Sequence, residues 1–184
     1  MRGIASKGQL RMSFLRYALV TVPLVVLLGI VSGRASNSGY GNDWFDALVK
    51  PTIMPPSWAF PVAWTTLYIL LGLALAMILH ARGARGRGGV LALFLLQLAL
   101  NYAWSPVFFS MHQPVPALIM ILAMIGLSAA AAVLMWPIRK AAALLMLPYL
   151  AWLCFAALLN YGIVQLNPDA SELVPGAVSA DIGI

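Results

Sequence analysis

The feature that most constrains the fold of this chain is its series of apolar runs, several of which reach the ~20 residues that a helix needs to cross a bilayer. Only 9% of the 184 residues are charged, whereas about 25% are charged in an ordinary globular domain. The runs predict an all-α integral membrane protein, a bundle of five transmembrane helices at about residues 14–33, 60–80, 90–109, 115–136 and 141–165.

Two terminal segments flank the predicted five-helix domain, which covers residues 14–166. Residues 1–13 form a basic arm, and residues 167–184 are acidic and are expected to be a disordered tail. A basic start before an apolar run is also typical of a cleavable signal peptide, so that alternative stays open for the first run. The count of five helices favours a first helix that is retained.

The distribution of charge predicts the orientation of the bundle. With five spans, the N-terminus and the second and fourth loops share one side, which carries nine Lys and Arg residues and no acidic residue. The other side carries two basic residues and all five acidic ones. Because basic residues concentrate on the cytoplasmic side of a membrane, the N-terminus is predicted to be cytoplasmic. This topology explains the net charge of +6 without a nucleic-acid partner.

The most distinctive stretch runs from residue 42 to residue 68, with three of the six tryptophans and four of the twelve prolines. Asn42 or Asp43 is a suitable cap for a short helix over residues 44–49, and Pro55-Pro56 fixes an extended backbone after it. Long loops with their own secondary structure are usually functional. We therefore expect a structured lid between the first and second helices. In the alternative interpretation the loop tryptophans are interfacial anchors at headgroup level, and for Trp58 both remain open.

Aromatic and amide side chains recur at helical spacing in the second, third and fifth helices. The pairs and series that share a face are Trp64 with Tyr68, Gln97 with Asn101, and Tyr149, Trp152, Ala156 and Asn160. Polar amides at membrane depth normally point into the bundle. Ligand contact and interhelical hydrogen bonding both account for the amides.

Several chemistries have no support in the sequence. The predicted helices carry no carboxylate, which argues against a proton relay or cation pump of the usual kind. His80 and His112 fall at opposite membrane faces and Cys154 is the single cysteine, so no metal site is expected. Motifs for phosphoryl transfer and hydrolysis are also missing. What remains is an aromatic-lined cavity with a few amides.

Four ordered motifs carry a resemblance to a known family: W-F-D-A-L-V-K-P-x-x-x-P-P-x-W at 44–58, F-P-V-A-W-T-T-L-Y at 60–68, Q-L-A-L-N-Y-A-W-S-P-V-F-F at 97–109 and P-Y-L-A-W-L-C-F-A-A-L-L-N-Y at 148–161. On these motifs the chain resembles a bacterial member of the translocator protein / tryptophan-rich sensory protein family (TspO/MBR), also called the peripheral-type benzodiazepine receptor family. The likeness runs from the first helix to Gln165.

The resemblance implies a five-helix bundle, usually a homodimer, with a cavity closed by the first loop. Family members bind porphyrins such as protoporphyrin IX and haem, and the mitochondrial members also bind cholesterol. Porphyrin or haem is then a ligand, and no cofactor is required. Helical spans suit the bacterial inner membrane, although bacterial relatives have been placed in the outer one.

The family's pocket positions carry over to Trp44, Pro55, Pro56, Phe60, Ala63, Trp64, Asn101, Trp104, Tyr149, Trp152, Ala156 and Asn160. Among them, Trp64 and Trp152 match the two tryptophans implicated in light-dependent porphyrin degradation. The chain departs from the family at Ile53, where a tryptophan is usual, and at Ser105, where a proline is common. No Lys or Arg follows Tyr161, so the cholesterol-recognition pattern is missing and cholesterol is a doubtful partner.

A porphyrin suits these residues on physical grounds as well. Indole faces stack well on a wide, flat, apolar ring, and Arg34 and Lys50 are candidates for a polar mouth that binds its propionates. The leading hypothesis is a membrane receptor, sensor or carrier for porphyrins. The alternatives are a light-dependent porphyrin-degrading activity that uses Trp64 and Trp152, and an oligomeric scaffold without a specific ligand.

Overall fold

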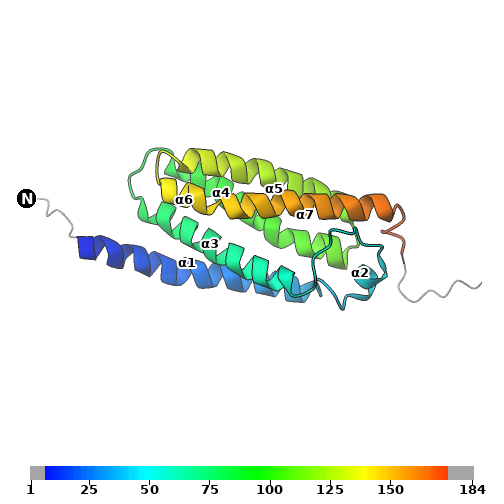
Figure 1. Cartoon of the computed structure of the whole chain (residues 1–184). Helices are drawn as coiled ribbons and strands as arrows, with labels where there is room; N and C mark the ends of the chain where they lie inside the picture. Colours follow the sequence, from blue (N-terminus) through cyan, green and yellow to red (C-terminus); the bar gives the residue numbers. More distant parts are fainter. Residues whose placement is uncertain (1–6, 174–184) are drawn as a thin grey trace, which may run out of the picture.

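The computed structural model describes residues 7–173, which form helices joined by loops (Figure 1). In chain order the helices are α1 (Lys7–Ala35), α2 (Asp43–Ala47), α3 (Ala59–His80), α4 (Arg87–Ser105), the π-helix η1 (Pro106–Ser110), α5 (Pro114–Met135), α6 (Lys140–Leu145) and α7 (Leu147–Leu166). Five apolar segments are long enough to cross a membrane, namely α1, α3, α4 with η1, α5, and α6 with α7. The predicted all-α bundle with five membrane-spanning segments is confirmed for the described residues.

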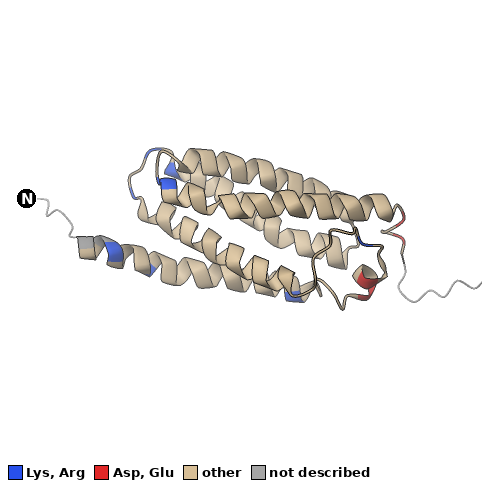
Figure 2. Ribbon diagram, viewed as in Figure 1, with Lys and Arg blue, Asp and Glu red and all other residues tan. Residues whose placement is uncertain are grey.

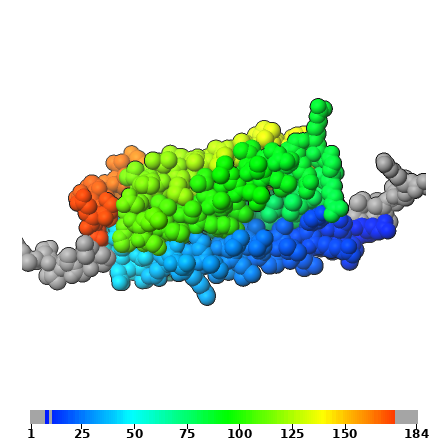
Figure 3. Space-filling model, turned by 180° about the vertical axis from the view of Figure 1, so that it is seen from behind, coloured from blue at the N-terminus to red at the C-terminus, as the bar shows by residue number. Residues whose placement is uncertain are grey.

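The spans are arranged in a ring whose order differs from the sequence. α1 lies along α3, α3 packs against α6, the α6–α7 pair packs against α5, and α5 packs against α4, which closes the ring on α1. Seen from behind, α1, α4 and α5 form one continuous side of the molecule (Figure 3). The short helix α2 and the rest of the first loop lie at the end of the bundle where α1 ends and α3 begins (Figure 1).

Two glycines allow α1 and α3 to approach closely. A Cβ atom at Gly72 would lie 2.6 Å from the Cα atom of Val22, and one at Gly29 would overlap the ring of Tyr68. The Oγ1 atom of Thr21 donates a hydrogen bond of 2.8 Å to the carbonyl of Gly72 across the same contact. Since the neighbours are a backbone and a large ring, larger side chains at either glycine would push the two helices apart.

Two prolines lie close to where one helix ends and the next begins within a span, and neither has an N–H to donate. At Pro106 the chain passes from α4 into η1. Pro148 cannot donate to the carbonyl four residues earlier, and α6 and α7 are separate helices that meet at Met146. The fifth predicted helix, 141–165, is therefore divided within one span into the 6-residue helix α6 and the 20-residue helix α7.

The two chain ends differ from their predicted boundaries. α1 begins at Lys7 rather than near residue 14, since residues 9–12 are good helix formers that extend the first span. The start of the predicted disordered tail, residues 167–173, is ordered into turns, and Ala170 is buried there. Its carbonyl accepts a hydrogen bond from the indole of Trp44. Residues 1–6 and 174–184 of the two terminal segments lie outside the described residues.

Charged side chains lie at the two ends of the bundle (Figure 2). Basic residues of the loops after α3 and α5 lie at the same end as the start of α1, and the described acidic residues lie at the other end with the first loop: Asp43, Asp46, Asp169 and Glu172. The orientation of these ends relative to the cytoplasm stays a prediction.

Candidate functional site

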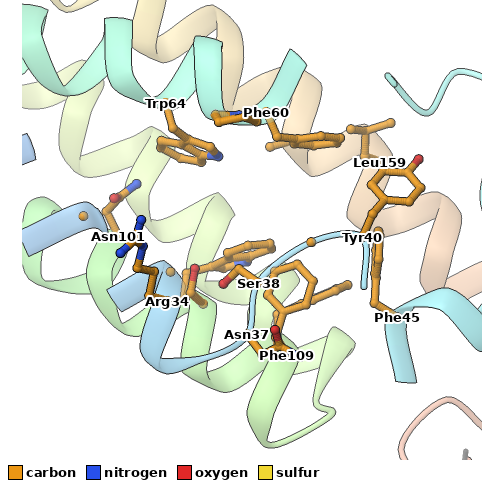
Figure 4. A pocket seen from close by; sticks show the side chains of 18 of the residues that line it. Arg34, Asn37, Ser38, Tyr40, Phe45, Phe60, Trp64, Asn101, Phe109 and Leu159 are labelled. Atoms are coloured by element: carbon orange, nitrogen blue, oxygen red, sulfur yellow. The ribbon is translucent and has the colours of Figure 1, made fainter. Parts of the chain in front are cut away.

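A cavity of about 460 Å³ lies inside the bundle at the end covered by the first loop (Figure 4). Its volume is within the range of about 300–1,000 Å³ that is typical of small-molecule sites. The lining comes from α1, the first loop, α3, α4, η1 and α7, and is rich in aromatic side chains: Tyr40, Phe45, Phe60, Trp64, Tyr68, Trp104, Phe108, Phe109 and Trp152. The cavity can therefore hold a flat, largely apolar molecule.

One wall consists of aromatic rings from α3 and α7. The ring centroids of Trp64 and Trp152 are 6.2 Å apart with the planes at 81°, and Phe60 meets Trp152 in a similar edge contact at 6.2 Å. Trp64 also stacks on Tyr68 at 5.4 Å. Phe60, Trp64 and Tyr68 follow one another at intervals of one turn on α3, so a single face of this helix presents all three rings to the cavity. Edge contacts of this kind leave indole faces available for a ligand.

The opposite wall comes from the end of α4 and from η1. Trp104 stacks on Phe108 at 5.0 Å with an interplanar angle of 17°, and Phe109 packs edge-on against both rings. The π-helical turn after Pro106 brings the two phenylalanines to the cavity. The buried indole N–H groups of Trp104 and Trp152 have no acceptor among the described residues. Two hydrogen-bond donors in the walls therefore remain unused by the protein.

A buried polar chain supports the cavity from behind. The hydroxyl of Tyr68 donates to the Oδ1 atom of Asn101 at 2.8 Å, and the Nδ2 atom of Asn101 donates to the hydroxyl of Tyr149 at 3.1 Å. Asn101 lines the cavity, whereas Tyr149 is fully buried between α4 and α5 and does not. The amide of Asn101 thus makes interhelical hydrogen bonds, and the residue also borders the cavity, where contact with a ligand stays a prediction. Tyr149 therefore orients the Asn101 side chain and is not itself part of the cavity wall.

Asn160 has a similar double placement on α7. It lines the cavity, but its side chain is buried. In the amide orientation that satisfies both atoms, Nδ2 donates to the Pro114 carbonyl at 2.9 Å and Oδ1 accepts from the Leu118 N–H at 3.2 Å. The amide therefore joins α7 to the first turn of α5. Although Asn160 was predicted as a pocket residue, both polar atoms of its side chain are used in this helix–helix contact.

The rim of the cavity is polar and comes from the end of α1 and the loop after it. Arg34, Asn37 and Ser38 are exposed and line the cavity, and Tyr40 lies at the loop side (Figure 4). The hydroxyl of Tyr40 donates to the Pro55 carbonyl at 3.2 Å, which ties this rim to the later part of the loop. Arg34 is the cationic side chain among the described lining residues.

Lys50 does not lie at this mouth, contrary to the prediction. Its Nζ atom donates to the carbonyls of Phe45, Asp46 and Leu48 at 2.8, 3.2 and 3.3 Å, and it lies 4.7 Å from the centroid of the Phe45 ring. The ammonium group thus satisfies carbonyls at the end of α2, which a short helix leaves unpaired. Lys50 stabilises the loop, and Arg34 remains as the basic group at the rim.

Trp44 anchors the first loop instead of contacting the cavity. It is 1% exposed, its Nε1 atom donates to the Ala170 carbonyl at 2.7 Å, and its ring stacks on His112 at 4.6 Å. Asn42 caps α2 as predicted, accepting from the Phe45 N–H at 3.0 Å. The cap and the buried indole together fix the orientation of α2 on the end of the bundle.

A second set of contacts holds the loop against α7. The Asn167 side chain accepts from the Val49 N–H at 2.8 Å and donates to the Val49 carbonyl at 2.9 Å. Pro51 lies against Gly162, where a Cβ atom would approach its ring to 3.0 Å. Together with Trp44, these contacts secure the loop to α7 and to the residues that follow it.

The structure brings eight of the predicted site residues to the cavity: Arg34, Phe60, Trp64, Asn101, Trp104, Trp152, Ala156 and Asn160. The predicted residues outside its lining are Trp44, Lys50, Pro55, Pro56, Ala63 and Tyr149. Ile53 and Trp58 are also outside it and are 53% and 67% exposed, which favours the interfacial interpretation of Trp58. Sequence reasoning missed the lining residues Tyr40, Phe45, Phe108 and Phe109. The three phenylalanines lie within quoted motifs, but Tyr40 and Phe45 belong to the first loop and follow no long helical spacing.

Comparisons with known proteins agree with the motifs. Residues 20–166 match the model of the TspO/MBR family. The tryptophan-rich protein TspO of Chlorobaculum tepidum is 40% identical over 126 residues, which cover 68% of this chain and 80% of the relative. The tryptophan-rich sensory protein of Cereibacter sphaeroides is 38% identical over 131 residues, covering 71% and 81%. The translocator protein of Bos taurus is 40% identical over 146 residues, covering 78% and 86%.

Proposed function

Because the chain belongs to the TspO/MBR family, we propose that this multi-pass membrane protein is a receptor or carrier for porphyrins, such as protoporphyrin IX and haem, and for similar flat apolar molecules. The observation that supports this most strongly is the cavity of about 460 Å³ with Trp64 and Trp152 on one wall and Trp104 on the other. A macrocycle between these walls would stack on indole faces. The unused N–H groups of Trp104 and Trp152 are donors for its polar atoms.

The rim completes the fit to a porphyrin. Its propionates need a cationic or polar mouth, which Arg34 with Asn37 and Ser38 provides. The described residues that line the cavity include no histidine, so an imidazole ligand for haem iron is not expected. A free-base porphyrin is therefore the favoured ligand over tightly bound haem.

A titration of the detergent-purified protein with protoporphyrin IX in the dark tests the proposal. We expect saturable quenching of indole fluorescence that is greatly weakened in a Trp64→Phe/Trp152→Phe variant. The matched control is Trp58→Phe/Trp136→Phe, because both of those indoles are exposed outside the cavity. Equal binding by the two double variants would overturn the proposal, and a wild-type protein without saturable binding would favour a scaffold.

A second candidate function is light-dependent degradation of the bound porphyrin. The edge contact between Trp64 and Trp152 places two oxidisable rings together at the cavity wall. Excited porphyrin and oxygen would supply the reactive species, so the chemistry would belong largely to the ligand. Loss of porphyrin absorbance under illumination should then require folded protein and fall in Trp152→Phe. Equal bleaching with denatured protein would exclude this activity.

We also propose a homodimer in the bacterial inner membrane with a cytoplasmic N-terminus. The exposed alanines Ala92, Ala99 and Ala103 of α4 are small residues that permit close helix contact. On a Cys154→Ser background, Ala99→Cys should form an intermolecular disulfide, whereas a cysteine at exposed Leu122 on α5 should not. A reporter enzyme that is active only outside the cytoplasm should be active when fused to the C-terminus.

A further inference from the structure

A second hollow, of about 350 Å³, lies on the outside of the bundle at its basic end. It is an apolar groove between the end of α5 and the start of the α6–α7 segment, and it is lined by Ala132, Val133, Trp136, Pro137, Ala143, Leu144 and Leu147. The two alanines are buried, whereas the larger side chains are exposed. Small side chains on facing helices thus form the floor, and larger apolar ones form the walls.

The groove lies where two membrane spans end. The α5 span ends at Met135, and the next span begins at Lys140. The hydrocarbon core of a bilayer extends along such spans, and their ends reach the headgroup region. An outward-facing apolar groove at this depth is therefore bordered by the upper part of an acyl chain and by the headgroup that carries it.

Lys140 adjoins the headgroup end of the groove, and Arg139 precedes it directly in the chain. Arg139 and Lys140 are both exposed, and the Nζ atom of Lys140 lies 5.7 Å from the centroid of the Trp136 ring, which is part of the groove wall. Leu144, also in the wall, is one helical turn after Lys140 and thus on the same face of α6. The acidic residues of the described chain lie at the opposite end of the molecule (Figure 2), so no carboxylate among them neutralises these charges.

We propose that this groove is a binding site for an anionic phospholipid, with one acyl chain against the apolar walls and the phosphate held by Arg139 and Lys140. Charge complementarity selects the anionic headgroup, as basic pockets between transmembrane helices do on a cytoplasmic surface. The site is separate from the central cavity and does not depend on its ligand.

The test uses the full chain in nanodiscs of phosphatidylcholine that contain increasing fractions of phosphatidylglycerol with brominated acyl chains. Bromine quenches an indole on contact, and the difference between wild type and Trp136→Phe isolates the signal of Trp136. Brominated phosphatidylcholine gives the reference for a zwitterionic lipid. Since each basic side chain near a membrane surface favours an anionic lipid about fivefold, the two together should lower the half-quenching fraction by about five- to twenty-five-fold.

Three variants separate the contributions of charge and groove. Arg139→Gln/Lys140→Gln should bring the phosphatidylglycerol curve to the phosphatidylcholine curve, whereas Arg85→Gln, an exposed basic residue at the same end, should leave it unchanged. Leu144→Asn should weaken quenching by both lipids and keep their ratio, because it changes the wall and not the charge. Coinciding curves in the wild type, or full lipid preference in Arg139→Gln/Lys140→Gln, would overturn the proposal.

Discussion

The same helices form a tightly packed half and a hollow half of the bundle. In the half near the basic end, Leu71, Ile78, Phe94, Met135 and Met146 are 0% exposed, and the helices meet through small residues such as Gly72 and Ala142. In the other half, half-buried tryptophans line the cavity: Trp64 of α3 and Trp152 of α7 meet edge-on, whereas Trp104 of α4 stacks on Phe108. Aliphatic and small side chains interdigitate, whereas large rigid rings in edge contact hold helices apart.

The hollow half is nevertheless closed by strong contacts at its outer end. The first loop is fixed there by Trp44 and by the hydrogen bonds between Val49 and Asn167. The comparison therefore shows how a bundle can keep an internal space: it concentrates packing in one half and supports the other half from outside.

The largest effect is expected for Trp44→Ala, which removes a fully buried indole and its hydrogen bond to Ala170. Deletion of a buried aromatic side chain costs about 3–5 kcal/mol. Thermal unfolding should show this loss, and hydrogen exchange should increase in residues 42–54 and 167–173 rather than in α6. Trp58→Ala is the matched control, because that indole is 67% exposed; equal destabilisation by both would contradict an anchoring role.

Gly72→Ala tests the tightly packed half. The added methyl group would lie 2.6 Å from the Val22 backbone, and overpacking of this kind costs about 1–3 kcal/mol. Gly126→Ala in α5 is the control, since no atom lies within 4 Å of its added Cβ. Chemical or thermal unfolding should separate the two variants. If Gly72→Ala were as stable as Gly126→Ala, the result would contradict a close contact between α1 and α3 at Gly72.

Ala156→Phe tests whether the hollow half must be empty for ligand to bind. The larger side chain would enter the cavity from α7, and we expect porphyrin affinity to fall about tenfold or more, which corresponds to at least about 1.4 kcal/mol. Ala151→Phe, on the exposed side of the same helix, should bind porphyrin as the wild type does. A reversed order of the two affinities would place the ligand on the outside of the bundle.

The smallest effect is expected for Arg34→Gln at the rim. Because Arg34 is exposed, its ion pair with a propionate is worth only about 0.2–1 kcal/mol. Affinity for protoporphyrin IX should therefore fall by a small factor, and affinity for its dimethyl ester should not change. An equal loss for acid and ester would mean that Arg34 contributes through packing and not through charge.

The sequence predicts the spans and the helical part of the cavity because both follow local rules. Apolar length identifies the five spans, and the spacing of four residues places Trp64 with Tyr68 and Trp152 with Ala156 on single faces. Phe60 and Trp104 line the cavity as the family resemblance implies, and Arg34 lines it as expected from its charge on the lid side. Periodicity is informative here because a helix fixes the direction of each side chain.

The sequence fails where a side chain finds a partner far away in the chain. Trp44 binds the carbonyl of Ala170, 126 residues later. A tryptophan expected in the pocket is therefore an anchor, and residues 167–173, the described start of a tail expected to be disordered, are ordered into turns. The prediction for Lys50 fails for the opposite reason. Its ammonium group, expected at the mouth of the cavity, binds backbone carbonyls that lie within five residues of it in the chain. Asn160 and Tyr149 lie on the predicted stripe, but buried hydrogen bonds to other helices occupy them.

The most direct test of the central claim is the protection of a single thiol by porphyrin. On a Cys154→Ser background, Ser38→Cys places a thiol on the exposed rim of the cavity, and Met111→Cys places one at the same end of the molecule outside it. Protoporphyrin IX should slow maleimide modification at Ser38→Cys with the same concentration dependence as the indole quenching, and should leave Met111→Cys unchanged. Equal protection of both positions, or none at Ser38→Cys under saturating porphyrin, would contradict binding in this cavity.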